Sequence, residues 1–323
     1  MRTKPRFAVL AALVVAFGIL QASAQEEETF DLFRPQLQIG LESTADRNFK
    51  EDEPPFINAQ EDTYRWQAAD LNLNLPLGGT RLGSSGKLLG HQVFMHVSTE
   101  GSRAQLSFLQ DDLSLYRGGL GFTALMLGRS RRLYAAGLFA NFAEEKETVS
   151  KPDVRYTGLA VGSVRKGSAL ILYGGAFTYQ LGRGLVLPLF GALGSIGPNW
   201  TIGGVFPFLF KARYQSSPKW NLGLFMKVRG NRYGFEDRED AFGQGRNTHL
   251  DVRLVEGRIG AGIGWVLSHH LTLSGEAGSS VARRLIVTDG TDDILRAGMK
   301  PAPYARIQMK IAFGETLMDS DAP

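Results

Sequence analysis

His96, Val97 and Ser98 form the spacing in this chain that comes nearest to nucleophilic chemistry. Residues two apart on a β-strand point to the same face, so the His96 imidazole could act as a general base towards the Ser98 hydroxyl. Val93, Met95 and Val97 occupy the opposite, apolar face. The sequence assigns no Asn or acid on a neighbouring strand to orient the imidazole. Two polar residues on a wet strand face are therefore the simpler interpretation, and catalysis stays an alternative.

Other kinds of chemistry find little support in the composition. The chain has no cysteine, so thiol catalysis and Cys-ligated metal sites are excluded. His269 and His270 are adjacent in a turn and would point to different sides, so we expect no metal site and no cofactor. Without Arg2, Lys4 and Arg6, which belong to a predicted leader, 33 Lys and Arg face 32 Asp and Glu. This near-neutral balance indicates no nucleic-acid partner.

Charged and polar residues recur at alternate positions of apolar segments, which predicts that they line the inside of a barrel. These lumen candidates are Lys211, Arg213, Lys227, Arg229, Glu276, Arg306, Gln308 and Lys310. Basic residues prevail among them, and rings of Arg and Lys favour anions in pores. The alternative is a charged network that fills a small lumen, with Glu276 paired to a neighbouring Arg.

The last predicted strand, 304–313, shows the elements that would hold these residues. Its alternate positions separate into one lipid-compatible set and one wet set: Ile307, Met309, Ile311 and Phe313 against Arg306, Gln308, Lys310 and Ala312. A final strand that ends in an aromatic resembles the signal that barrel-assembly machinery reads, and we expect that machinery as a partner during biogenesis. The tail at 314–323 departs from this pattern.

Similar segments predict an all-β fold, a transmembrane antiparallel up-and-down β-barrel of about 14 strands. Twelve strands remain an alternative because 104–111 is ambiguous, and the count of 14 needs a break near Pro207, which cannot donate to a central ladder. The predicted strands are 35–43, 64–75, 89–99, 112–127, 132–143, 153–165, 169–182, 184–195, 199–206, 208–215, 220–233, 249–267, 270–287 and 304–313. Long connections are predicted at 44–63, 143–153, 234–248 and 288–302.

The N-terminus predicts export. A basic start, the apolar stretch Phe7–Leu20 and the small residues Ala22-Ser23-Ala24 are typical of a cleaved Sec-type signal peptide. The predicted organisation is a signal peptide at 1–24, a periplasmic segment at 25–34, the barrel at 35–313 and the tail. No later run is apolar enough to span as a helix, so a barrel in the cell outer membrane of a Gram-negative bacterium is expected, surrounded by its lipid.

Aromatic residues beside the connections predict girdles at the two membrane interfaces. Trp200, Trp220, Trp265 and Phe313 lie next to short turns or at the chain end and would form the periplasmic girdle. Trp66 and Tyr304 follow long connections and would form the external one. Short turns on the periplasmic side and long loops outside place both termini in the periplasm.

The segment 180–235 resembles an uncharacterised family of bacterial outer-membrane β-barrel proteins. The residues that carry the resemblance are Pro188-Leu189-Phe190-Gly191, Trp200 to Pro207, Tyr214 to Trp220 and Arg229 to Tyr233. The resemblance implies a barrel and no activity. We expect a non-enzymatic, porin-like narrow pore or solute-binding channel for small polar or anionic solutes. The alternatives are a structural or surface-interaction barrel without conductance, and a lipid hydrolase using His96 and Ser98, a spacing that resembles outer-membrane phospholipases.

Overall fold

A computed structural model gives the fold of the chain. It describes residues 35–50, 61–81, 88–109, 112–128, 132–146, 154–180, 183–206, 208–237, 240, 242, 244–245, 248–289 and 292–313. The predicted signal peptide, the segment 25–34 and the tail 314–323 lie outside these residues. No helix in the described ranges has the length and apolar character needed to cross a membrane.

The described residues form β-strands connected by turns. The strands are β1 (Gln36–Asn48), β2 (Thr63–Arg81), β3 (Leu88–Leu106), β4 (Leu113–Gly128), β5 (Leu133–Glu145), β6 (Arg155–Lys166), β7 (Ala169–Gln180), β8 (Arg183–Ile196), β9 (Trp200–Phe206), β10 (Leu209–Ser217), β11 (Trp220–Asp237), β12 (Thr248–Ser268), β13 (Leu271–Asp289), β14 (Asp292–Gly298) and β15 (Ala302–Ala312). Apolar and polar residues alternate along most of them, as a wall between two environments requires.

The strands close into a single antiparallel barrel. From β1 to β14 each strand pairs with its neighbour in the chain, while β15 pairs with β13 and, from Ala312↔Gln36 to Tyr304↔Thr44, with β1. β14 and β15 pair with the two halves of β13 and act as one interrupted strand, so the barrel has 14 strands as predicted. β9 ends at Phe206 and β10 begins at Leu209, which confirms the predicted break between them.

One predicted loop is wrong. The segment 288–302 was expected to be a long connection, but β13 continues to Asp289 and β14 returns beside it in register, with Leu285 opposite Ala297 and Val287 opposite Leu295. These four side chains are almost completely buried. Their alternation with charged residues hid the strand, because acidic and basic residues on its outer face resemble a solvated loop.

An apolar belt surrounds part of the barrel. Its outward positions carry large exposed side chains, such as Leu41 on β1, Leu138 on β5, Phe206 on β9 and Leu224 on β11. On β11 the outward positions are apolar from Trp220 to Val228 and become polar beyond it. A continuous belt of this kind is the surface that a membrane barrel presents to lipid.

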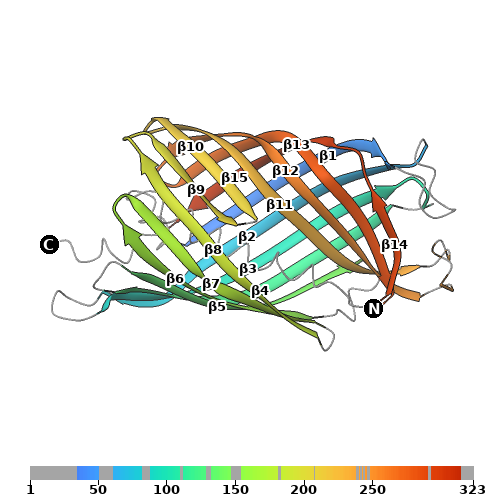
Figure 1. Cartoon of the computed structure of the whole chain (residues 1–323), viewed down its shortest axis with the longest axis horizontal. Helices are drawn as coiled ribbons and strands as arrows, with labels where there is room; N and C mark the ends of the chain where they lie inside the picture. Colours follow the sequence, from blue (N-terminus) through green and yellow to red (C-terminus); the bar gives the residue numbers. More distant parts are fainter. Residues whose placement is uncertain are drawn as a thin grey trace.

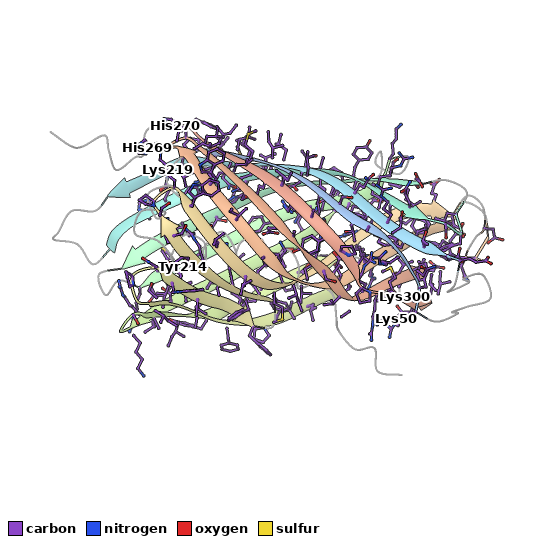
Figure 2. All side chains as sticks on the ribbon, turned by 90° about the horizontal axis from the view of Figure 1, so that it is seen from above. Lys50, Tyr214, Lys219, His269, His270 and Lys300 are labelled. Carbon is purple, nitrogen blue, oxygen red and sulfur yellow. The ribbon has the colours of Figure 1, made fainter. Side chains whose placement is uncertain are left out.

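The two ends of the barrel differ. We call the end with the turns 167–168, 197–199, 218–219 and 269–270 the short-turn end, and the opposite one the loop end. Figure 2 shows Lys219, His269 and His270 at the short-turn end and Lys50 with Lys300 at the loop end.

Four of the six predicted girdle residues lie at the short-turn end. Trp200, Trp220, Trp265 and Phe313 are exposed there, and the rings of Trp220 and Trp265 stack at 5.0 Å. Trp66 and Tyr304 are the correction, because both are buried inside the barrel and cannot form an external girdle. Alternation explains this, since Trp66 shares its face with Asp70 and Tyr304 shares its face with Arg306.

The barrel narrows towards the loop end because β6–β10 end before β5 and β11 do (Figure 1). β5 pairs with β6 only as far as Asn141, and β11 pairs with β10 only as far as Lys227. Beyond these points β5 and β11 meet directly, through a parallel bridge between Glu144 and Gly234. Strand direction alternates from β1 to β13, so β5 and β11 run in the same direction and meet in parallel.

The narrow half is filled by a cluster that we call the loop-end core. Its members come from β1–β5, β11–β14 and the segments beside them: Phe49, Tyr64, Trp66, Ala68, Ala104, Leu106, Leu113, Leu115, Ala143, Tyr233, Phe235, Phe242, Leu250, Val252, Leu254, Leu285, Val287, Leu295, Ala297 and Met299. Each is less than a tenth exposed. Such packing is that of a protein interior and fills the cross-section of this half with side chains.

Candidate functional site

A layer of buried charges lies next to the loop-end core, on its short-turn side. At its centre, Arg258 on β12 donates to Glu42 on β1 and to Glu256, both at 2.6 Å, and all three side chains are 1% exposed. Arg229 on β11 also pairs with Glu42. Glu256 accepts further from Ser280 and lies 3.5 Å from Arg283 Nε on β13. These contacts join strands on both sides of the β13–β15–β1 closure.

The layer continues across β2, β3 and β4. Arg117 contacts Glu100 at 2.5 Å, and the Tyr233 hydroxyl donates to the other Glu100 oxygen at 2.7 Å. Arg306 on β15 donates to Asp70 at 2.8 Å. Arg229 lies within 3.7 Å of Glu100, which joins this part to the centre. We call the whole set the charged layer: Glu42, Asp70, Glu100, Arg117, Arg229, Glu256, Arg258, Arg283 and Arg306.

The charged layer contacts the core through aromatic rings. The guanidinium groups of Arg229, Arg258 and Arg283 lie over the rings of Trp66, Tyr304 and Tyr64, at 5.7, 4.5 and 5.3 Å from their centroids. A cation over an aromatic face is stabilised by the ring quadrupole, most strongly where water is excluded. The buried Trp66 and Tyr304 thus hold the arginines between ion pairs and the apolar core.

The eight predicted lumen residues fall at two levels. The register places all eight on the inward face of β10, β11, β13 and β15. Arg229 and Arg306 belong to the charged layer. Lys227 pairs with Glu276 on β13, so the acidic residue has a lysine as its partner where an arginine was expected. The filled-lumen alternative therefore describes these ion pairs better than a ring of exposed cations does.

Below the charged layer, towards the short-turn end, the lumen wall is polar on one side. Lys211, Arg213, Gln308 and Lys310 are half-buried there, together with the Lys227–Glu276 pair. Arg213 donates to Gln215 at 3.0 Å, and Gln308 donates to Gln38 at 2.9 Å. We call this space the vestibule. Four of its side chains are cationic and Glu276 is anionic, so its wall has an excess of positive charge.

The opposite wall of the wide half is apolar. Its inward residues pack as a second cluster, which includes Leu159, Val161, Leu172, Leu189 and Leu193 on β6, β7 and β8. These side chains are less than a tenth exposed. The wide half is therefore partly filled too, and the half-buried inward side chains described above belong to its polar wall.

His96 is held in a hydrogen-bond chain that does not use Ser98. Its Nδ1 lies 2.6 Å from Asn74 Oδ1 on β2, and its Nε2 lies 2.9 Å from Thr123 Oγ1 on β4. The Nδ1-protonated tautomer satisfies both contacts, donating to Asn74 and accepting from the threonine hydroxyl. The ring also packs at 5.7 Å from Phe139. Asn74 is the orienting amide that the sequence could not assign, but it supports a buried network around His96.

The residues that sequence reasoning missed are the partners of the arginines, above all Glu42, Glu100 and Glu256. Each is a single acid at an inward position of a long alternating strand, and the sequence gives no sign of which strands meet across the lumen. The available signal was the cost of placing a charge inside a membrane-spanning strand, which predicts a partner for each such acid.

The chain resembles solved structures of membrane barrels. No family model matches the chain, so its family stays a prediction, and no curated protein matches it. Among solved structures, the translocator domain of autotransporter NalP from Neisseria meningitidis shares 11% identity, with 94% of this chain and 96% of that one covered and a TM-score of 0.34. The β domain of the Bordetella autotransporter BrkA shares 9%, with 87% and 100% covered and a TM-score of 0.37. LpxR from Salmonella typhimurium shares 11%, with 86% and 100% covered and a TM-score of 0.34.

Proposed function

We propose that this protein is an outer-membrane barrel that is closed towards the cell exterior and open towards the periplasm as a basic vestibule for small anionic solutes. The observation that carries the proposal is the loop-end core with the charged layer beneath it. Short turns face the periplasm in outer-membrane barrels, so the short-turn end is assigned to that side and the loop end to the exterior. No catalytic step is part of the proposal.

The filled half argues against a permanently open pore. Tyr64 and Trp66 on β2, Leu115 on β4 and Tyr233 on β11 are at most 2% exposed. An ion that crossed this half would have to displace an apolar core, or break buried ion pairs and leave charges without partners. Both are costly, so resting conductance is expected to be absent.

The vestibule supports the binding part of the proposal. Its wall contains Lys211, Arg213, Lys227 and Lys310. Glu276 forms an ion pair with Lys227 and is also attracted by the charge of Lys211. An excess of cations in a confined space attracts small anions. A solute that enters from the short-turn end would meet these groups before it reached the charged layer.

Planar-bilayer recording tests the proposal directly. Purified, folded protein should give no stepwise currents, whereas the double variant Trp66→Ala/Tyr233→Ala should give them because it removes two large side chains from the filled half. Leu224→Ala/Leu222→Ala, on the lipid-facing side of β11, is the matched control and should stay silent. Regular channel events from the unmodified protein would refute the closed state.

A further inference from the structure

A second feature lies on the outer surface, at the loop end, where β13, β14 and the end of β1 run side by side. The backbone N of Lys50 donates to Gly298 O at 2.9 Å, and the backbone N of Lys300 donates to Asn48 O at 3.0 Å. Gly298 is opposite Arg284 on its other side. A glycine therefore stands between two cationic residues, with Lys300 diagonally beside Lys50.

These residues face outwards. Their chain neighbours Phe49, Arg283 and Met299 point into the barrel and are at most 1% exposed, and successive residues of a strand point to opposite faces. Lys50, Arg284 and Lys300 are exposed. Figure 2 shows Lys50 and Lys300 next to one another at the loop end. The three cations therefore share one solvent-facing surface.

Gly298 leaves room on this surface for the side chain of Lys50. It has no side chain, and the aliphatic part of Lys50 lies across the space that a Cβ would occupy, with Cδ 3.5 Å away. Directly opposite residues on paired strands are about 5 Å apart, so the backbones of Lys50 and Arg284 are about 10 Å apart across the glycine. Long Lys and Arg side chains can close that distance around one phosphate group. We call Lys50, Arg284, Gly298 and Lys300 the glycine notch.

The height of the notch on the barrel indicates its partner. Towards the short-turn end, the outward positions include Val281 on β13 and Ile307 on β15, and Ile307 is 60% exposed. The notch thus lies just beyond the apolar belt, on the side of the loop end. Lipid headgroups occupy this level of a bilayer, and basic clusters there attract anionic ones at about 1 kcal/mol per Lys or Arg.

We propose that the glycine notch binds the phosphate group of an anionic lipid in the external leaflet. The inference rests on the membrane orientation in the proposed function, but not on the vestibule or the closed lumen. Three neighbouring cations repel one another, and a phosphate would relieve that repulsion while its acyl chains lie against the apolar belt. A lipid is thus favoured over a free anion, because it can use both surfaces at once.

The test compares lipid binding by the purified barrel in detergent, with diphosphoryl lipid A and its dephosphorylated form as probes. The unmodified protein should retain the phosphorylated lipid preferentially. Lys50→Gln/Arg284→Gln/Lys300→Gln should weaken this retention on the order of a hundredfold. Arg132→Gln/Lys166→Gln/Lys219→Gln removes the same charge at the short-turn end and should leave retention unchanged.

A substitution at the floor of the notch gives a second measure. Gly298→Glu should abolish the preference for phosphate, and Gly298→Ala should preserve it, since a Cβ meets only ordinary contacts there. The proposal is overturned if the protein binds both lipids equally, or if the two triple variants lose the same fraction of lipid retention. It is also overturned if inorganic phosphate displaces the lipid at equal concentration. Labelling of the single variant Lys50→Cys in intact cells by a bulky maleimide that does not cross the outer membrane measures the orientation separately, so a failure of the proposed orientation is distinguishable from a failure of the notch.

Discussion

The narrow and wide halves of the barrel differ in the side chains that line and fill the lumen. The narrow half, which ends at the loops, joins apolar side chains from strands on every side and seals them with the charged layer. The wide half has an apolar cluster along β6–β8 and a polar wall along β10–β15. One half is therefore built like the core of a soluble domain, and the other keeps a polar interior.

The difference arises from strand length. β12 has 21 residues, while β9 has 7. β5 and β11 continue beyond β6–β10 towards the loop end and close on each other through Glu144 and Gly234. Fewer strands enclose a narrower space, which side chains can fill. The closed lumen is thus a consequence of the five strands that end early as much as of the residues that fill it.

The largest expected effect comes from breaking the charged layer at its centre. Arg258→Met should lower the free energy of unfolding by about 3–5 kcal/mol, because it leaves the buried Glu42 and Glu256 with one cation fewer between them. Urea unfolding in lipid vesicles measures the change. Arg296→Met is the matched control, since Arg296 pairs with Asp293 at the surface and both are largely exposed. A surface pair is worth at most about 1 kcal/mol.

If Arg258→Met and Arg296→Met lower the free energy of unfolding by the same small amount, the charged layer does not hold the two halves together. The closed lumen would then depend on the apolar core alone, and the two halves would differ only in how their apolar side chains pack.

The second expected effect separates the halves by accessibility. The chain has no cysteine, so labelling of a single introduced cysteine can be measured without reaction at any other thiol. Lys310→Cys in the vestibule should react readily with a membrane-impermeant maleimide, whereas Leu115→Cys in the loop-end core should react about a hundredfold more slowly, because it must await a local opening. Equal labelling rates would show that the narrow half is not closed in solution.

Sequence patterns predicted the wall of the barrel better than its contents. Alternation in 304–313 and the break near Pro207 gave correct strands, because inward and outward faces differ along each strand. Alternation also placed Arg229 and Arg306 inside. It could not pair Arg258 with Glu42, which lie 216 residues apart in the chain. Trp66 was misplaced for a related reason, since its distance from a turn was weighed above the face that it shares with Asp70.

The smallest expected effect concerns His96 and Ser98 in the wide half. His96→Phe keeps a ring but removes the two nitrogens that bridge Asn74 and Thr123, so it should cost about 1–3 kcal/mol of unfolding free energy through unsatisfied buried partners. Ser98→Ala should change stability by no more than about 0.5 kcal/mol and should leave any phospholipid or lipid A hydrolysis unaltered. Lipid hydrolysis that Ser98→Ala abolishes in a stably folded barrel would restore the catalytic interpretation. The opposite outcome leaves His96 as a structural bridge between β2 and β4, and assigns the polar wall to binding alone.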